Sequence, residues 1–447
     1  MKKNLVLVLA LFFVLASVAC NSGPAASTPG TTSQTQGSVQ TTEATTVDNS
    51  TPSSITLFFP WDPESAGVTD RLWFEQINKK WSAMHPDIEL VMEGAPNQGL
   101  EMLQTRLAAG TMGDVFVHQT RLAAFAQAGY LMDISDQPWV ERMVDGVKPD
   151  CIWNDKVWAA PLDCNGWGVY YMKDIYEGEL GLGIPNDFDE FLDICQKIKD
   201  AGYDPLIAGG SEGWPFQGLF LSFTSFLYGQ NENFHIDLYN GDASLAGPEM
   251  FELFSAIQEL YDRGFFSDGC MSFDMPQTRQ YMADGKAVIG FGCPGVITPL
   301  EQEENGSYDL GYFYIPDRQG YNCVPVIACW VISINADYKY GSTLGIDLLN
   351  CMIDDESLHA RHDNVTPSSF SDLSMTYDTT GGQAYQDAFD KGPVVLQCTS
   401  WLPSSIFNQY QQIVSSIISG SGFTQEMLDN MEATYRADIK NVNVLQP

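Results

Sequence analysis

Apolar and polar positions follow two different periods in the first part of the folded chain. Residues 55–59 are a short apolar run ended by a proline, which is typical of a buried strand that opens into a loop. Residues 70–84 carry Trp73, Ile77 and Trp81 at helical spacing, so we expect a helix whose apolar face, including both tryptophans, belongs to the core. A strand followed by an amphipathic helix is the first unit of an α/β fold.

The same alternation then repeats. Residues 88–92 and 115–117 predict two further strands, with a helical pattern between them. This order favours a mainly parallel sheet covered by helices. Ligands of such sheets bind beyond the carboxyl ends of the strands, which here indicates the loops that hold Trp61, Asp62 and Gln119.

The amino terminus has the pattern of an export signal. A basic start precedes an apolar run at residues 5–14, which is shorter than the roughly 20 residues of a membrane-spanning helix, so residues 1–19 are predicted to be a cleaved signal peptide. Its end resembles the lipobox of bacterial lipoproteins, which implies that Cys20 carries a lipid such as palmitate and becomes the mature amino terminus. An ordinary signal peptide in which Cys20 has no special role is the alternative.

The segment after the signal differs in composition from the rest of the chain. Residues 20–54 consist mainly of Ser, Thr, Gly, Ala, Gln and Pro, so they have little to bury and predict a flexible tether between the membrane and a folded body. The body from Ile55 to Pro447 is longer than one hydrophobic core usually grows, which predicts two lobes.

Charge and cysteine usage narrow the classes of function. The formal net charge of -35 argues against nucleic acid or an anionic surface as partner and favours a neutral or cationic ligand. Nine cysteines follow Cys20 without C-x-x-C spacing, and several lie in apolar runs, so we read them as small buried side chains and expect no metal and no cofactor.

Several passages in a fixed order resemble a known family. The most specific is residues 158–174, which read WAAPLDCNGWGVYYMKD and are followed by PNDFDEF at 185–191; shorter ones are HPDI at 85–88, APNQ at 95–98 and GDVF at 113–116. Together they resemble family 1 of the extracellular solute-binding proteins of ABC transporters, which serves sugars. The resemblance covers essentially residues 55–440.

The resemblance implies a fold and a division of the chain. The fold is α/β, of the two-lobed periplasmic-binding-protein type II, in which each lobe is a mainly parallel sheet flanked by helices and a hinge joins the lobes. Residues 55–163 and 315–355 are expected to form the first lobe. Residues 164–314 and 356–447 are expected to form the second lobe. In it the passage from Trp401 to Ile418 is expected to close over the ligand, and the helix after Phe423 to complete the lobe.

The resemblance also implies a function and partners. It describes a monomeric receptor, lipid-anchored on the extracytoplasmic face of the cell membrane, that binds a mono- or oligosaccharide between its lobes and delivers it to the permease of an ABC importer. It is not an enzyme. A peptide, a polyamine or another small solute is the alternative ligand, because the acidic charge tolerates cations.

The residue types near the predicted cleft suit a sugar, which has an apolar face that aromatic rings cover and a hydroxyl rim that carboxylates and amides bind. The candidate faces are Trp61, Trp167, Trp214, Trp330 and Trp401, and the candidate rim groups are Asp62, Gln119, Asp163 and Asn165. Core packing is an alternative role for Trp330, and pinning the hinge is an alternative role for Asp163 and Asn165.

An exported serine hydrolase is the rival from another class. Residues 209–213 read GGSEG and satisfy G-x-S-x-G, with Ser211 as nucleophile and His359 or His362 as its base. A glycine-rich loop that lets Trp214 reach the cleft is the simpler interpretation. The histidines at 359 and 362 are expected at a solvated helix end rather than at a metal.

Overall fold

The computed structural model describes residues 52–61, 68–94, 99–119, 122–229, 231–296, 308–363 and 365–441. The predicted signal peptide, Cys20 and the tether up to residue 51 lie outside these residues, and so does Asp62. Residues 52–447 form one compact unit. In the part of the chain that is described, no helix has the length and apolar character needed to cross a membrane.

The first sheet has five strands in the order β2-β1-β3-β12-β6. Its strands and the two intervening helices follow the predicted alternation: β1 (Ser54–Phe59), α1 (Val68–Met84), β2 (Glu89–Gly94), α2 (Gly99–Ala109), β3 (Val115–His118), β6 (Ala160–Pro161) and β12 (Val331–Ile334). On α1, Trp73, Ile77 and Trp81 are buried, and the Trp73 and Trp81 indoles donate to the carbonyl oxygens of Met352 and Ile88 at 2.9 and 2.8 Å. Their assignment to the core is confirmed.

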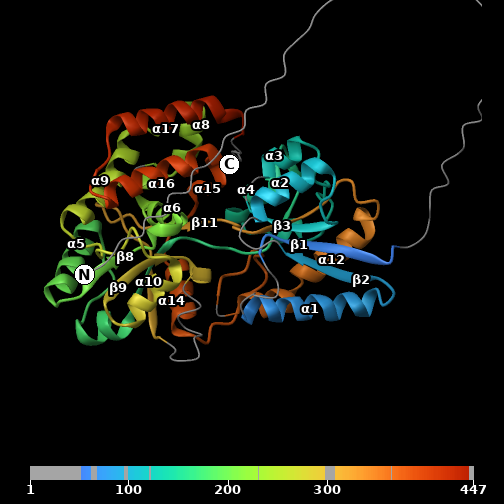
Figure 1. The fold of residues 1–447 in the computed structure, drawn as a ribbon, viewed down its shortest axis with the longest axis horizontal. Coiled ribbons are helices and arrows are strands. Elements are labelled where there is room, and N and C mark those ends of the chain that lie inside the picture. Colours follow the sequence, from blue (N-terminus) through green and yellow to red (C-terminus); the bar gives the residue numbers. More distant parts are fainter. Residues whose placement is uncertain are drawn as a thin grey trace, which may run out of the picture. The chain divides into compact units, whose positions relative to one another are not determined.

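The second sheet has four strands in the order β10-β7-β9-β8. These are β7 (Gly168–Met172), β8 (Asp204–Ile207), β9 (Ala287–Gly292) and β10 (Leu310–Phe313). In Figure 1 the elements of the first sheet and those of the second gather in two separate groups of labels, with the helices α5, α6 and α10 near β8 and β9.

Four of the five strands of the first sheet and three of the four strands of the second run in one direction, so both sheets are mainly parallel, as predicted, with one reversed strand each. In the first sheet β1 runs parallel to β2 and β3, whereas β12 is antiparallel to β3 and β6. In the second sheet β8 is parallel to β9, whereas β7 is antiparallel to β9 and β10. The reversed strands are β12 and β7, and each directly follows a segment on which the chain crosses between the sheets. A strand that follows such a crossing enters its sheet from the end opposite to that of a βαβ strand.

Three segments lie where the two sheets meet and are bonded to one another: the first and second crossings of the chain and a third segment, residues 394–397, that runs beside them. Asn165 and Ile327 exchange both of their backbone hydrogen bonds at 2.8 Å, which joins the first crossing to the second. Parallel pairing of β11 (Val324–Val326) with β13 (Val394–Leu396) joins the second to the third. The first and second crossings approach so closely that a Cβ at Gly166 would lie 2.0 Å from the carbonyl oxygen of Pro325, so this position requires glycine.

The remaining helices cover the sheets and follow ordinary capping rules. Side chains of Asp187, Asp274, Asp354, Thr379 and Thr424 accept backbone N–H groups at five helix starts, and Asp274 forms a full capping box. The other elements are α3 (Leu122–Gln127), α4 (Lys148–Cys151), β4 (Ile152–Trp153), β5 (Lys156–Val157), α5 (Phe188–Asp200), α6 (Trp214–Leu221), α7 (Ser225–Tyr228), α8 (Phe234–Asn240), α9 (Pro248–Asp262), α10 (Met275–Ala283), α12 (Ile346–Ile353), α13 (Asp355–His362), α14 (Thr380–Phe389), α15 (Cys398–Trp401), α16 (Ser404–Ile418) and α17 (Gln425–Asp438).

The predicted lobe boundaries are compatible with these sheets but stay a prediction. The strands of the first sheet come from residues 54–161 and 331–334, and those of the second from 168–313. Helix α13, which follows the predicted boundary at 355, packs against α1 of the first sheet. A boundary beyond residue 362 therefore describes the packing better.

Candidate functional site

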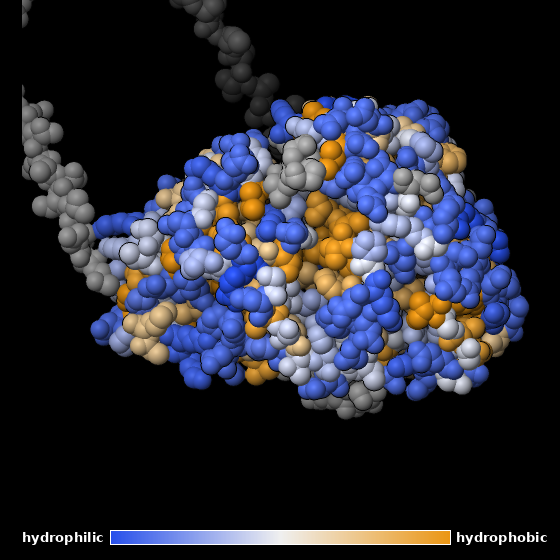
Figure 2. Space-filling view, turned by 180° about the vertical axis from the view of Figure 1, so that it is seen from behind, coloured by the Kyte–Doolittle hydropathy of each residue, from blue (hydrophilic) through white to orange (hydrophobic). Residues whose placement is uncertain are grey.

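A cavity of about 800 Å³ lies where the crossing segments meet helices from both groups. Figure 2 shows hydrophobic residues gathered near the middle of one face of the molecule, between more polar flanks. The described residues that line the cavity are Thr69, Asp70, Gln119, Asp163, Asn165, Trp167, Trp214, Gln217, Gly218, Leu221, Cys293, Gly295, Val296, Ile327, Cys329, Trp330, Arg361, His362, Val365, Thr366, Gln397, Thr399 and Phe407.

One side of the cavity, which we call the α6 wall, consists of Trp167 together with Trp214, Gln217, Gly218 and Leu221 of α6. The rings of Trp167 and Trp214 meet edge to face, with centroids 6.2 Å apart and planes at 69°. A Cβ at Gly218 would lie 1.9 Å from Cζ3 of Trp167, so the absence of a side chain at this position is what lets the indole lie against α6. Trp214 is 38% exposed. The α6 wall therefore presents aromatic surface, of which Trp214 is the more exposed part.

The opposite side, which we call the α13 wall, consists of Asp70, Trp330, Arg361 and His362. Trp61 lies behind Trp330, with ring centroids 4.9 Å apart and planes at 68°. The Arg361 guanidinium forms an ion pair with Asp70 and lies over the rings of Trp73 and Trp61, 4.6 and 5.7 Å from their centroids. This wall is thus continuous with the core of the first sheet, because Trp73 of that core lies directly under Arg361.

His362 is a structural member of the α13 wall. It is 4% exposed, its Nε2 donates to the carbonyl oxygen of Leu162 at 2.6 Å, and its Nδ1 accepts from the Thr366 hydroxyl at 2.9 Å. Burial and the neighbouring Arg361 lower the pKa of His362 to about 3, so it is neutral at physiological pH. The expectation of a solvated helix end was wrong for His362, because α13 packs on α1 and its last turn lines the cavity, whereas the His359 side chain is 37% exposed.

Asp163 and Asn165 lie between the two walls, on the first crossing. The Asp163 carboxylate accepts the backbone N–H of Trp330 at 3.1 Å and the side-chain N–H of Asn165 at 2.8 Å, and it is 4% exposed. Burial raises the pKa of Asp163 to about 6, against the lowering effect of these donors and of Arg361. The Oδ1 of Asn165 is buried and has no hydrogen-bond partner among the described residues.

Amide side chains complete the polar lining. Gln397 is 2% exposed, donates from Nε2 to the Thr399 hydroxyl at 3.0 Å, and keeps its Oε1 without a partner within the described part of the chain. Gln217 donates to Oε1 of Gln411 at 3.0 Å. Gln119 follows β3 directly and its Nε2 lies 3.8 Å from the Cys329 sulfur. The cavity thus combines aromatic faces with amides, two carboxyl groups and one guanidinium.

The nine predicted ligand residues do not all lie in the cavity. Six of them line the cavity: Gln119, Asp163, Asn165, Trp167, Trp214 and Trp330. Trp61 supports Trp330 from behind, and Asp62 lies outside the described residues. Trp401 is 1% exposed and packs against Phe234 and His235, so the structure does not bring it to the cavity and we remove it from the candidates.

Sequence reasoning missed Arg361, Asp70 and Gln397. Each lies in the cavity through a contact between distant parts of the chain: Arg361 pairs with a residue of α1, and Gln397 donates its backbone N–H to Val326 of the second crossing. The one local signal was the spacing of Leu358 and His362, both buried, on one face of α13.

Comparison with known families decides the class of protein. Residues 65–355 match the family described as "Bacterial extracellular solute-binding protein". This chain belongs to that family.

Known members are similar over parts of this solute-binding protein. A "Multiple sugar-binding protein" of Streptococcus mutans is 29% identical over 147 residues, which are 32% of this chain and 34% of that protein. A "Putative binding protein" of Brucella abortus is 23% identical over 238 residues, which are 52% of this chain and 56% of that protein. The chain therefore spans about a third to about half of the length of these relatives.

Solved structures are similar over most of the chain. A "Chitin oligosaccharide binding protein" has a TM-score of 0.73 and 16% identity, and covers 87% of this chain and 99% of its own. The unliganded RafE of Streptococcus pneumoniae has a TM-score of 0.69 and 20% identity, and covers 88% of this chain and 99% of its own. At these identities the likeness shows the fold, which is that of the type II binding proteins.

The rival hydrolase arrangement is not formed in this solute-binding protein. Ser211 is exposed on the short turn between β8 and α6. His362 uses both ring nitrogens within the α13 wall, and His359 is 2.9 Å from the Asp363 carboxylate. No hydrogen bond joins Ser211 to either histidine within the residues described, so the G-x-S-x-G pattern here is a loop that leads into Trp214.

The thiols of the solute-binding protein are free. All nine cysteines in the described ranges are unpaired, and seven of them are buried, as expected for small apolar side chains. Cys293 and Cys329 are partly exposed and line the cavity. Among the described residues no cluster of three or more His, Cys, Asp or Glu side chains is suited to a metal ion.

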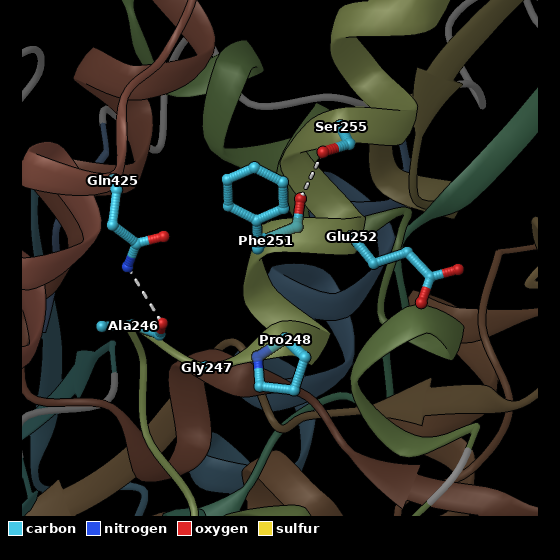
Figure 3. A pocket seen from close by; sticks show the side chains of 7 residues that line it. All are labelled: Ala246, Gly247, Pro248, Phe251, Glu252, Ser255 and Gln425. Atoms are coloured by element: carbon cyan, nitrogen blue, oxygen red, sulfur yellow. Dashed lines mark hydrogen bonds between the residues drawn. The ribbon is translucent and has the colours of Figure 1, made fainter.

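A second hollow of about 470 Å³ lies between the amino-terminal ends of α9 and α17 (Figure 3). Its polar side chains are already engaged: Gln425 donates to the carbonyl oxygen of Ala246 at 3.1 Å, and Ser255 donates to that of Phe251 at 2.7 Å. Phe251 is 45% exposed and packs on Phe423. This hollow offers fewer free polar groups than the cavity between the walls, which is the better candidate site.

Proposed function

We propose that this protein is the extracytoplasmic receptor of an ABC importer and that it binds a carbohydrate in the cavity between the α6 and α13 walls. The observation that carries the proposal is the combination of indole surface at Trp167, Trp214 and Trp330 with the buried polar groups of Asp163 and Asn165. An indole covers the apolar C–H face of a sugar ring, while carboxylates and amides bind its hydroxyl rim.

The names of similar proteins support a sugar. The relative from Streptococcus mutans is a multiple sugar-binding protein, a relative from Pyrococcus abyssi is a maltotriose-binding protein, and RafE has been solved with raffinose. The volume of about 800 Å³ leaves room for a mono- or oligosaccharide. Peptides and polyamines remain alternative ligands and are included in the test below.

Ligand capture by closure fits the connection between the sheets. Three bonded segments where the sheets meet support a hinge, and the cavity is lined from both sides of it. A sugar that contacts both walls binds the closed form better than the open form and shifts the population toward it. The closed form then presents the surface that the permease recognises.

The remaining parts of the proposal concern location and chemistry. We propose that residues 1–19 direct export, that a lipid on Cys20 holds the mature protein at the membrane, and that residues 20–54 act as its tether. We propose a monomer that performs no covalent chemistry, so binding and release are its whole activity.

The test measures the binding of sugars, oligosaccharides, peptides and polyamines to residues 21–447 by tryptophan fluorescence and calorimetry. We expect saturable binding of a saccharide and a loss of affinity of roughly fivefold or more in Trp167→Ala, because one aromatic face contributes on the order of 1 kcal/mol or more. Trp153→Ala is the matched control, since Trp153 is partly buried on β4 and does not line the cavity. Binding of a peptide or polyamine with no response to any saccharide would replace the proposed ligand.

A further inference from the structure

A single cationic side chain lines the described part of the cavity, and most of its hydrogen-bonding capacity is unused. Arg361 lies near the end of α13, and its Nη1 pairs with the Asp70 carboxylate. Its Nε is buried and has no partner among the described residues, and none of them accepts a hydrogen bond from Nη2. A guanidinium has five N–H donors, so most of those on Arg361 remain available.

Aromatic rings hold the guanidinium in place. Its carbon lies 4.6 Å from the centroid of the Trp73 ring and 5.7 Å from that of the Trp61 ring. Trp73 is fully buried on α1, and the Arg361 side chain is only 11% exposed. A cation held in this way has lost most of its water and much of its freedom before any ligand arrives. Binding to donors that are already fixed costs less conformational entropy than binding to mobile ones.

Asp70 decides which edge of the guanidinium stays free. Its carboxylate takes Nη1 and leaves the edge formed by Nε and Nη2. That edge carries two parallel N–H groups, which match a pair of adjacent oxygen atoms. An oxygen pair can therefore bind there while the ion pair between Asp70 and Arg361 stays intact.

The polar neighbours of Arg361 do not fill this edge. Asp163 accepts the Trp330 N–H and the Asn165 side chain, and His362 uses Nε2 and Nδ1 for the Leu162 carbonyl and the Thr366 hydroxyl. A buried N–H group without an acceptor is costly, and more so when it carries charge, so in a binding cavity it indicates a place for a ligand or a water molecule.

We propose that Arg361 anchors the ligand, which presents two adjacent oxygen atoms to Nε and Nη2. In a neutral saccharide these are two vicinal hydroxyls, and in an acidic saccharide they are the two oxygens of a carboxylate. The inference rests on the proposed carbohydrate function and adds a ligand-binding residue to it.

The first experiment is calorimetry on residues 21–447 with maltose, cellobiose, raffinose, β-1,4-mannobiose, α-1,4-galactobiose and digalacturonic acid. Arg361→Lys keeps the positive charge, but an ammonium cannot offer two parallel N–H groups. We expect the probe that binds most tightly to lose at least tenfold in affinity, since a lost hydrogen bond to a charged group amounts to about that factor or more. Tighter binding of digalacturonic acid than of α-1,4-galactobiose assigns the oxygen pair to a carboxylate, and the reverse order assigns it to hydroxyls.

Arg318→Lys is the matched control. Like Arg361, Arg318 pairs with carboxylates, those of Asp189 and Glu259, and lies over an aromatic ring, that of Phe188. It does not line the cavity. We therefore expect no measurable change in affinity for the same probe.

A second comparison separates a direct contact from general damage to the cavity. Monodeoxy derivatives of the neutral probe that binds most tightly remove one hydroxyl at a time, and α-1,4-galactobiose serves as the derivative of digalacturonic acid that lacks the carboxylates. We expect the wild type to lose about tenfold or more when the oxygens bound by Arg361 are removed, and this difference to shrink by most of that factor in Arg361→Lys. A variant that weakens the parent sugar and all its derivatives by one common factor would contradict a direct contact.

NMR of the wild type with isotope-labelled arginine covers the case in which Arg361→Lys does not fold. An N–H group that gains an acceptor on the ligand should shift its signal and exchange with water at least tenfold more slowly when the same probe is saturating. Among the described lining residues Arg361 is the one arginine, so we expect one Nε–H signal to respond.

The outcomes separate the two proposals. If a saccharide binds the wild type and Arg361→Lys keeps its affinity, or no arginine signal responds to that saccharide, the anchor is overturned and the carbohydrate function stays intact. Failure of every saccharide to bind, here and in the ligand screen, would overturn the carbohydrate function itself.

Discussion

The two walls of the cavity are built in different ways. The α13 wall is backed by core: Trp330 rests on Trp61, and Arg361 rests on Trp73, which is fully buried on α1. On the α6 wall Trp167 is seated against Gly218, whereas Trp214 is more than a third exposed. We infer that the α13 wall is a fixed platform and that Trp214 of the α6 wall is the adaptable aromatic, because packing density around a side chain limits its rotamers.

The largest expected effect comes from removing the backing of the α13 wall. Trp73→Ala deletes a buried indole, its hydrogen bond to Met352 and the surface under Arg361, so we expect the free energy of unfolding to fall by about 3–5 kcal/mol. Urea unfolding of residues 21–447 measures it. Trp153→Ala should cost clearly less, since Trp153 is only partly buried. A loss below about 1 kcal/mol in Trp73→Ala would contradict the platform interpretation.

The second prediction concerns the pH dependence of stability. Asp163 is coupled to the α13 wall because its carboxylate accepts the backbone N–H of Trp330. Its pKa is raised in the folded state from 3.8 to about 6, so the folded protein binds this proton more tightly than the unfolded chain. Its contribution to stability is therefore present below about pH 4 and is lost as the pH rises to 6, by about 3 kcal/mol at 1.36 kcal/mol per pKa unit.

Asp163→Asn removes this titration. The difference in unfolding free energy between the variant and the wild type should shift in favour of the variant by about 3 kcal/mol between pH 4 and pH 7. Urea unfolding at both pH values measures this shift, and Asp317→Asn serves as the comparison at another buried acid. A difference that does not change with pH would show that the Asp163 proton is not coupled to folding.

The smallest expected effect is on the α6 wall. In Gly218→Ala the new methyl group would meet the Trp167 ring, so the indole has to move, and we expect a stability loss of about 1–3 kcal/mol together with a shifted Trp fluorescence maximum and weaker ligand binding. Gly183→Ala is the matched control, because no heavy atom lies within 4 Å of its added Cβ. Equal effects of the two substitutions would mean that Gly218 has no role in seating Trp167.

The sequence predicted local structure well where periodicity decides it. The strand at 55–59, the helix at 70–84 and the core side of that helix follow from apolar spacing, and each is confirmed. Six of nine candidate ligand residues lie in one cavity, because they stand at strand ends or next to glycine and proline, where loops approach a cleft. Their role in binding stays a prediction.

The failures have a common physical cause. Arg361 and Gln397 reach the cavity through pairing with α1 and with the second crossing, and no local pattern carries that information. Trp401 looked like a cleft aromatic beside a proline, yet it packs on α8 side chains more than 160 residues earlier in the chain. The reversed strands β7 and β12 escaped prediction because direction depends on where the chain re-enters a sheet, which spacing does not record.

The position of β12 has a consequence for the order in which the molecule can be assembled. This strand completes the first sheet beside β3, but it lies more than 200 residues further along the chain. A ribosome that has made everything up to residue 330 has therefore not yet supplied the strand that joins β3 to β6, and the second sheet is by then already complete. Neither group of strands can be obtained by cutting the chain once, and a nascent chain cannot complete the first sheet until synthesis is about three-quarters done.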